Sequence, residues 1–221
     1  MRNSGRVLLW LVSVSIAGSV SINAKPQSFQ QLVDAYFEDY FKANPSQATI
    51  TGFHQYDSQL EDFSLAAHQR NRRRLLEYLA AFQAINPQKL SQLDRDDREI
   101  MIATIHSALL EEDRVQMWRK NPDNYSSAVT SSIFSLIKRD FAPLEERLRS
   151  VIAREKQIPR ALMQARAVLL NPPKIYTDIA IEQLPGNTEF SKRQFPKVSV
   201  SLKTPFCWLN SSRATTRRSP R

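Results

Sequence analysis

The chain of 221 residues contains one cysteine and four glycines. A single cysteine, Cys207, cannot form an intrachain disulfide, which excludes a disulfide-stabilised framework. Only Gly52 and Gly186 lie in residues 25–190, and Asn-Gly or Asp-Gly hairpin turns are absent there. So few glycines also leave no glycine-rich phosphate-binding loop. These absences argue against β-hairpin architectures and against nucleotide-binding loops.

Motifs of the common hydrolytic sites are missing as well. There is no Gly-x-Ser-x-Gly and no Cys-x-x-Cys. Of the three histidines, His54, His68 and His106, none precedes a glutamate and no two stand four residues apart, so a His-Glu-x-x-His zinc helix is absent. We expect His106 to be a partly buried structural histidine. His54 is expected in a polar loop held by side-chain capping, with a functional site there as the alternative. The sequence assigns no catalytic, cofactor-binding or metal-binding residue.

Acidic residues are lacking in one segment, residues 191–221, which contains eight of the 31 Lys and Arg residues. All 22 acidic residues lie within residues 25–190, so that stretch is nearly neutral while the chain carries a formal charge of +9. A pI near 9.9 would ordinarily suggest a nucleic-acid partner. Because the excess lies in one segment and not on a folded face, nucleic acid is not expected as a partner. The basic run 70–74 is expected to form a solvated helix face.

The first 24 residues have the pattern of a secretory signal peptide. Arg2 and Arg6 precede an apolar run at residues 7–22, and Ala24 is a small residue suited to cleavage. The run is shorter than the roughly 20 residues of a spanning helix. We therefore expect no stable membrane span and an exported protein, periplasmic or extracellular. An uncleaved N-terminal anchor is the alternative.

Residues 25–190 are predicted to form one all-α domain, an antiparallel helical array with short proline-marked loops. Apolar residues recur with helical spacing, as in the stripe of Phe29, Leu32, Val33, Tyr36, Phe37, Tyr40 and Phe41. Asn-Pro pairs recur where helices should stop, because the residue before proline disfavours helical backbone angles. The expected helices are one from residue 29 to the stop at Asn44-Pro45, 45–51 ending at Gly52, one from the Ser64 N-cap to the stop at Asn86-Pro87, 94–119, 126–138, one with Pro143 in its first turn, and a short one at 177–184. Pro159 either kinks the helix after Pro143 or starts a next helix, which breaks at Asn171-Pro172-Pro173. In the helix after Pro143, the expected inward residues are Leu144, Leu148, Val151 and Ile152.

Four segments together are similar to a known family. They are NPSQATITGFHQYDSQLEDFS (44–64), LDRDDREIMIATIHSALLEEDR (93–114), NPDNYSS (121–127) and the stretch from SIFSLIKRDF to IEQLPG (132–186). They resemble the N-terminal part of the bacterial domain of unknown function 885, over about residues 28–190. The resemblance implies a fragment of a larger, exported, helical zinc metallopeptidase-like fold with a peptide substrate. The zinc ligands and the general base of that fold would lie in a C-terminal half with no counterpart here. This chain would supply one helical wall of the cleft and no cofactor of its own.

The resemblance ends at Phe190, where the composition also changes. We expect residues 191–221 to be an out-of-frame or disordered basic, Ser/Arg-rich tail. The chain would then be a truncated, exported member of a zinc-dependent peptidase family, inactive alone. The alternative is a non-enzymatic exported helical binding protein that uses its basic C-terminal tail on an anionic partner. A small helical inhibitor of a related peptidase is a third interpretation. The sequence indicates no oligomeric state.

Overall fold

The computed structural model describes residues 28–194, and this range is helical without strands. The α-helices are α1 (Phe29–Ala43), α2 (Pro45–Thr51), α3 (Leu65–Ala84), α4 (Gln92–Leu110), α5 (Met117–Lys120), α6 (Asp123–Lys138), α7 (Leu144–Glu155), α8 (Ile158–Val168) and α9 (Lys174–Gln194). Short 3-10 turns, η1 (His54–Tyr56) and η2 (Pro87–Lys89), and one π turn, η3 (Glu111–Val115), join some of them. The all-α prediction is confirmed. The signal sequence, Cys207 and most of the basic tail lie outside the described residues.

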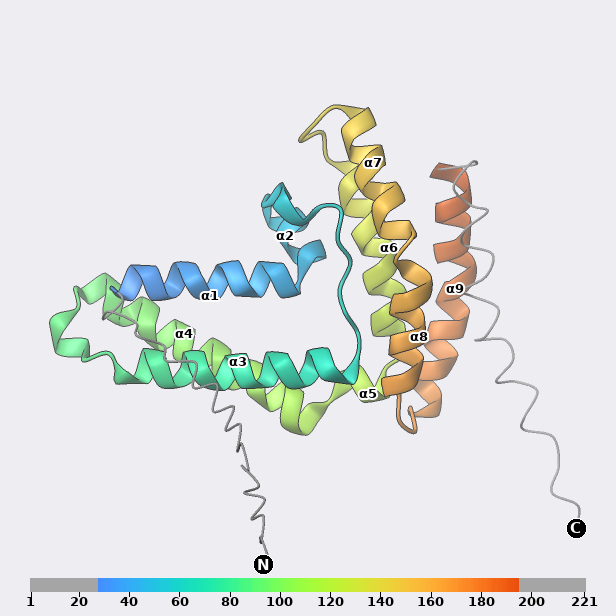
Figure 1. Cartoon of the computed structure of the whole chain (residues 1–221). Helices are drawn as coiled ribbons and strands as arrows, with labels where there is room; N and C mark the ends of the chain where they lie inside the picture. The colour runs from blue at the N-terminus through green and yellow to red at the C-terminus, as the bar shows by residue number, and fades with distance from the viewer. Residues whose placement is uncertain (1–27, 195–221) are drawn as a thin grey trace, which may run out of the picture.

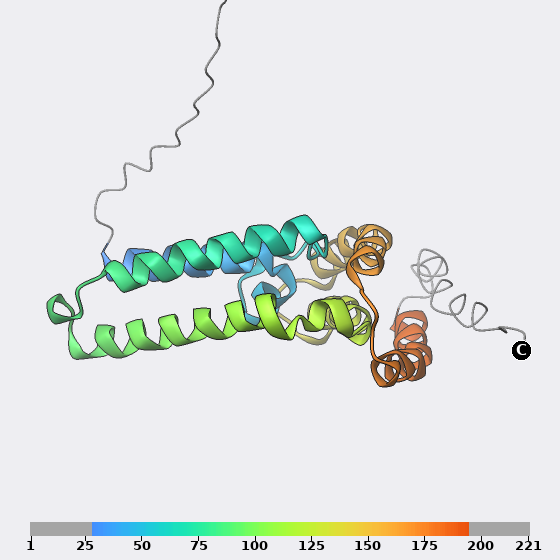
Figure 2. The same cartoon turned by 90° about the horizontal axis from the view of Figure 1, so that it is seen from below.

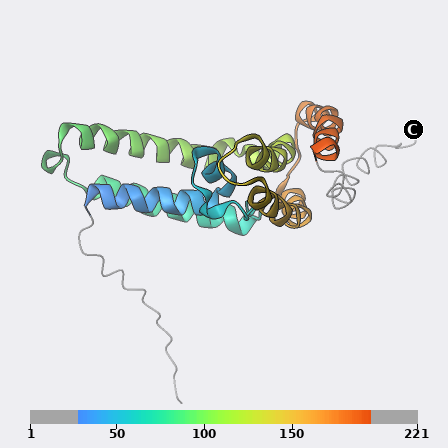
Figure 3. The same ribbon diagram turned by 90° about the horizontal axis from the view of Figure 1, so that it is seen from above.

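The helices form two groups that meet at a corner (Figure 1). In the first group, here called the arm, α1 and α4 run antiparallel to α3 (Figures 1 and 3). In the second, here called the bundle, α6 packs against α7, α8 and α9 (Figure 2). The short helix α2 contacts both α1 and α6. Residues 52–64, here called the corner segment, pass the corner between α2 and α3. None of the described helices is long and apolar enough to cross a membrane.

Helix α1 begins where its sequence predicts. The Ser28 hydroxyl accepts a hydrogen bond from the Gln31 backbone N–H, and the Gln31 side chain accepts one from the Ser28 N–H, which completes a capping box. Phe29, Leu32, Tyr36 and Phe41 of the apolar stripe are buried, whereas Phe37 remains 41 % exposed. The stripe is therefore wider than the face that the neighbouring helices cover.

Gly52 ends α2 with a φ of 99°, a left-handed conformation that side chains with a Cβ disfavour. No atom lies within 4 Å of a Cβ built there, so the conformation alone explains the glycine. The Gly52→Ala variant should lose about 1–2 kcal/mol of unfolding free energy. Gly186, inside α9 with equally open space, is the matched control, and its alanine variant should gain about 0.5–1 kcal/mol. Urea titrations followed by circular dichroism would measure both, and equal effects would contradict the argument.

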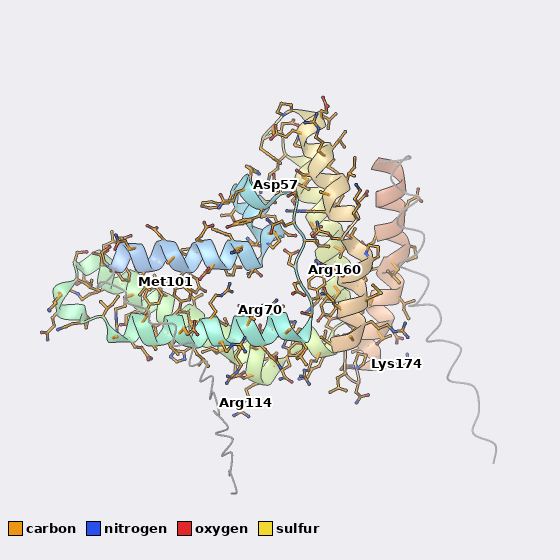
Figure 4. All side chains as sticks on the ribbon, in the orientation of Figure 1. Asp57, Arg70, Met101, Arg114, Arg160 and Lys174 are labelled. Carbon is orange, nitrogen blue, oxygen red and sulfur yellow. The ribbon has the colours of Figure 1, made fainter. Side chains whose placement is uncertain are left out.

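Two separate hydrophobic cores hold the two groups of helices. The arm core consists of buried residues from α1, α3 and α4, namely Phe29, Leu32, Tyr36, Leu75, Phe82, Met101 and Ile105. Figure 4 shows Met101 among the side chains that fill the space between α1 and α3. The bundle core is built on α6, α7 and α8, with Leu60 from the corner segment and Leu136, Val151 and Ala161 among its members. A small third cluster of Phe41, Ala48 and Tyr56 lies between α1 and α2.

The predicted helix 94–119 is wrong at both ends. Its true N-cap is Ser91, whose hydroxyl accepts the Asp94 N–H, so the helix begins before the acidic run. Beyond Leu110 it loosens into η3, and Gln116 then adopts a left-handed φ of 51°. Polar bonds support this break, because the Glu111 carboxylate accepts the Met117 N–H and the Glu111 carbonyl accepts the Gln116 N–H.

The boundaries of three further helices differ from the prediction. Helix α6 begins at Asp123, and the Pro143 residue is an N-cap and not part of the first turn of α7. The last helix is also longer than expected, since α9 covers Lys174–Gln194 with Pro185 inside it. Residue 185 therefore does not end the helix, and the first residues of the basic segment, 191–194, belong to α9.

The inward face of α7 is also different from the predicted one. Leu144 is 58 % and Ile152 is 43 % exposed, whereas Val151 is buried as expected. The other buried positions of α7 include Arg147 and Arg154. Arg147 donates to the carbonyls of Ile137 and Arg139 at the end of α6, at 2.8 and 2.9 Å. Hydrophobic spacing missed these positions because an arginine can be buried when carbonyl groups satisfy its donors.

Candidate polar cavity at the corner

An open cavity of about 710 Å³ lies where the arm meets the bundle. Its walls come from the end of α1, the corner segment, the first half of α3, η3, α5 and the start of α6. The charged and aromatic side chains of the lining are Asp39, Lys42, Glu61, Asp62, Phe63, His68, Arg70, Arg74, Glu112, Trp118 and Tyr125. Figure 4 shows Arg70 on the α3 side of the corner. Segments far apart in the sequence therefore present both signs of charge, together with aromatic rings, to one space.

A chain of hydrogen bonds runs along the wall that α3 provides. The Asn71 amide donates to Glu112 at 2.7 Å, and its oxygen accepts from Arg74 at 2.5 Å. Arg74 also donates to the backbone carbonyl of Asp39. The Asp39 carboxylate accepts the Tyr78 hydroxyl at 2.7 Å, and burial, followed by this bond, raises the pKa of Tyr78. These bonds connect η3, α3 and α1 and fix the Arg74 guanidinium in place.

Aromatic stacking joins α3 to α5 in the wall of the cavity. The His68 ring stacks on Trp118 with centroids 4.0 Å apart, and the Arg119 guanidinium lies 4.5 Å from the same indole centroid. Trp118 therefore contacts both an imidazole ring and a guanidinium cation. His68 Nδ1 also lies 3.1 Å from Glu112. Position 68 is thus part of the candidate site, which the sequence analysis did not predict.

Each acidic side chain of the cavity lining accepts hydrogen bonds. Glu61 accepts from the Ser46 N–H and hydroxyl at 2.8 and 2.9 Å. Asp62 is bound by the Arg70 guanidinium at 2.8 Å. Burial alone would raise the pKa of Asp62, but bonds from Ser64 and Arg70 outweigh burial and lower it. Together with Glu112 and Asp39, all four carboxylates of the lining have donors.

Two of the three basic side chains of the lining have no acidic partner. Lys42 is exposed and makes neither a hydrogen bond nor an ion pair with residues 28–194. Arg74 is half-buried, and both of its acceptors, the Asn71 amide and a backbone carbonyl, are neutral. The Arg74 charge also opposes the rise that burial causes in the pKa of Tyr40. These two cations therefore keep hydrogen-bond donors free for a ligand, in a lining that has four carboxylates and three basic side chains.

A second polar network, which shares Pro45 with the cavity lining, fixes α2 to the bundle. The buried Arg154 donates to the Ser132 carbonyl and to the Thr49 hydroxyl, each at 2.6 Å, and to the Pro45 carbonyl at 3.2 Å. Thr49 in turn donates to Asp57 at 2.5 Å, and Asp57 lies 3.0 Å from His54 Nδ1. Burial lowers the pKa of Arg154. The network is a structural connection across the corner.

The three histidines lie apart. His54 pairs with Asp57 and stacks on Phe141 at 3.7 Å, which fits the predicted loop-holding role. His106 is exposed on α4, so its predicted partial burial is wrong, since the arm core covers the opposite face of that helix. Among residues 28–194, no three His, Cys, Asp or Glu side chains gather as a metal site would require. The described residues therefore do not fit the zinc that the family resemblance implies for the complete fold.

The basic run 70–74 only partly matches the predicted solvated face. Arg70 is 57 % and Arg72 is 47 % exposed, and they pair with Asp62 and Asp113. Arg74 instead turns toward α1 and lines the cavity. Helical spacing could have indicated this, because residues 71, 74 and 78 share one face of α3.

A solved structure shares this arrangement of helices. It is described as "a putative lipoprotein of unknown function from Shewanella oneidensis", and it superposes with a TM-score of 0.73 at 23 % identity. The superposition covers 87 % of this chain and 40 % of that one, so this chain spans less than half of the length of that neighbour. The likeness establishes the fold. No curated protein matches the chain.

Sequence comparison identifies the family. The profile described as "Bacterial protein of unknown function (DUF885)" matches residues 45–218, and the chain belongs to that family. The match begins after α1 and continues through most of the basic segment, beyond residue 190 where the resemblance was expected to end. The out-of-frame origin of residues 191–221 stays a prediction that falls almost wholly outside the described residues.

Proposed function

We propose that this chain forms one wall of a peptide-binding cleft and is not itself a catalyst. The observation that carries the proposal is the open cavity at the corner, about 710 Å³ in volume, within the range of small-ligand sites. Its lining offers charges of both signs and aromatic rings. Peptides present matching groups: amide donors and acceptors, charged ends and apolar side chains.

The shape of the molecule supports a role as part of a larger binding surface. The solved neighbour is considerably longer than the region that this chain matches, since only 40 % of it is covered. Many large apolar side chains are exposed here, among them Leu93 at 70 %, Met163 at 65 % and Ile175 at 60 %. These residues lie on α4, α8 and α9, and we propose that further segments of the complete family fold cover them. A zinc-dependent peptidase activity would then belong to the complete family fold.

Export is part of the same proposal. The N-terminal segment has the charge and apolar pattern of a signal peptide, and the solved neighbour is described as "a putative lipoprotein". An exported location would give the cavity access to peptides of the periplasm or the medium.

Purified chain should bind peptides without cleaving them and without zinc. Equilibrium dialysis against the tryptic peptides of casein, followed by mass spectrometry, should show retained intact peptides. Metal analysis should find far less than one zinc per chain. Stoichiometric zinc together with peptide cleavage would overturn the non-catalytic assignment, and the absence of any retained peptide would overturn the binding assignment.

A further inference from the structure

Hydrogen-bond donors of the corner cavity that lack an acceptor indicate which chemical group of a ligand binds there. All four acidic side chains of the lining already accept hydrogen bonds, whereas Lys42 and Arg74 have no carboxylate partner among residues 28–194. Carboxylate oxygens can accept further hydrogen bonds, so the acidic side chains do not exclude a donor group of a ligand. Lys42 and the remaining N–H groups of Arg74 have no acceptor among the described residues, so a ligand should place its anionic, acceptor-rich group at these two cations.

The Arg74 guanidinium is held in a fixed orientation in which it can bind an anionic acceptor. Two of its N–H groups are bonded to the Asp39 carbonyl and the Asn71 amide, and its remaining N–H groups have no partner in the described part of the chain. The two bonds hold the guanidinium plane, which reduces the entropy lost on binding. A planar carboxylate matches the parallel N–H pair of a guanidinium better than a tetrahedral anion does.

Lys42 adds a second cation on the same side. It follows Asp39 by three residues, so the two positions share one face of α1 a single turn apart. The Asp39 carbonyl holds Arg74, and both cations line the same cavity. A carboxylate bound by Arg74 would therefore lie in the cavity that Lys42 also lines.

We propose that Lys42 and Arg74 form a subsite for a peptide carboxylate in the corner cavity. This subsite rests on the proposed peptide-binding function and specifies it further. The carboxylate can come from a peptide C-terminus or from an Asp or Glu side chain. The hydrogen-bond chain from Glu112 through Asn71 positions Arg74, and the stacked His68 and Trp118 line the same space.

Three N-acetylated alanine-based peptides would test the subsite by calorimetry with the purified chain. One has a free C-terminal carboxylate, one is its C-terminal amide, and one is an amide with a central aspartate. The free acid or the aspartate peptide should bind about tenfold more tightly than the neutral amide, and the stronger of the two identifies the source of the carboxylate. Equal affinities for all three would overturn the subsite while leaving peptide binding intact. Binding of none would instead remove the proposed function itself.

Variants separate the subsite from general charge effects. Arg74→Gln should abolish the preference for the charged peptide, and Lys42→Gln, at an exposed position without partners, should reduce it about threefold without affecting folding. Arg73→Gln is the matched control, since Arg73 is exposed, adjacent in the same basic run and not part of the lining. An equal loss in Arg73→Gln would overturn the proposal. So would inorganic phosphate binding as tightly as the charged peptide, because the subsite would then lack carboxylate selectivity.

Discussion

Replacing Arg154 with methionine is expected to lower the free energy of unfolding by about 3–5 kcal/mol. The side chain is fully buried and donates to the Ser132 and Pro45 carbonyls and to Thr49. Methionine fills much of the volume but leaves these buried acceptors without donors, and it removes the positive charge near the buried Asp57. Urea unfolding monitored by circular dichroism measures the loss.

The control for this prediction is Arg149→Met on the same helix. Arg149 is 74 % exposed and pairs only with Glu145, which is itself 81 % exposed. Its replacement should change the unfolding free energy by less than about 0.5 kcal/mol. A loss below about 1 kcal/mol for Arg154→Met would show that the acceptors find other donors and that the network does not hold α2 to the bundle.

Replacing Glu155 with glutamine should make stability less dependent on pH. Burial raises the pKa of Glu155 from its ordinary value to about 7. Between about pH 4.5 and pH 7 the folded chain then binds more protons than the unfolded chain, so stability falls as the pH rises through this window. Above pH 7 the buried, ionised Glu155 lowers the unfolding free energy of the wild type by about 3 kcal/mol, as expected for a pKa shift of this size. Glutamine remains neutral throughout, so its advantage over the wild type should grow from near zero at pH 4.5 to about 2–3 kcal/mol at pH 8.

Thermal unfolding of both chains from pH 4 to pH 9 provides the measurement. Glu145→Gln, at an exposed position of the same helix, should show a pH profile parallel to the wild type. If the Glu155→Gln curve also runs parallel to the wild-type curve, Glu155 ionises freely in the folded chain and the prediction fails.

Local chemistry predicted the fold where each helix end has its own signal. Asn44-Pro45, the Ser64 cap and Gly52 are all at the expected boundaries, because a proline, a capping hydroxyl or a positive φ acts on adjacent residues. The break at Gln116 has no such signal. It depends on the Glu111 side chain and on packing against the bundle, which residue spacing does not contain. Pro185 is the opposite case, because its sequence predicts the end of a helix whereas the residue lies inside α9.

The residues of the candidate site could not be predicted from the sequence for a similar reason. His68, Arg74, Glu112 and Trp118 are brought together by the corner between arm and bundle, and no motif spacing encodes that contact. The buried arginines of α7 were also missed, because their burial depends on carbonyl groups at the end of α6 and in α2. The sequence did predict that His54 belongs to a polar loop, since its partner Asp57 is only three residues away.

The two separate cores also determine how the chain unfolds. The arm core and the bundle core share no residue, and the contacts across the corner include the small Phe41, Ala48 and Tyr56 cluster, the polar network around Arg154 and the stack of His68 on Trp118. Each core can therefore act as its own cooperative unfolding unit. The cavity lies on the boundary between these units, so a ligand that contacts both would couple their unfolding and convert two partly independent foldons into one.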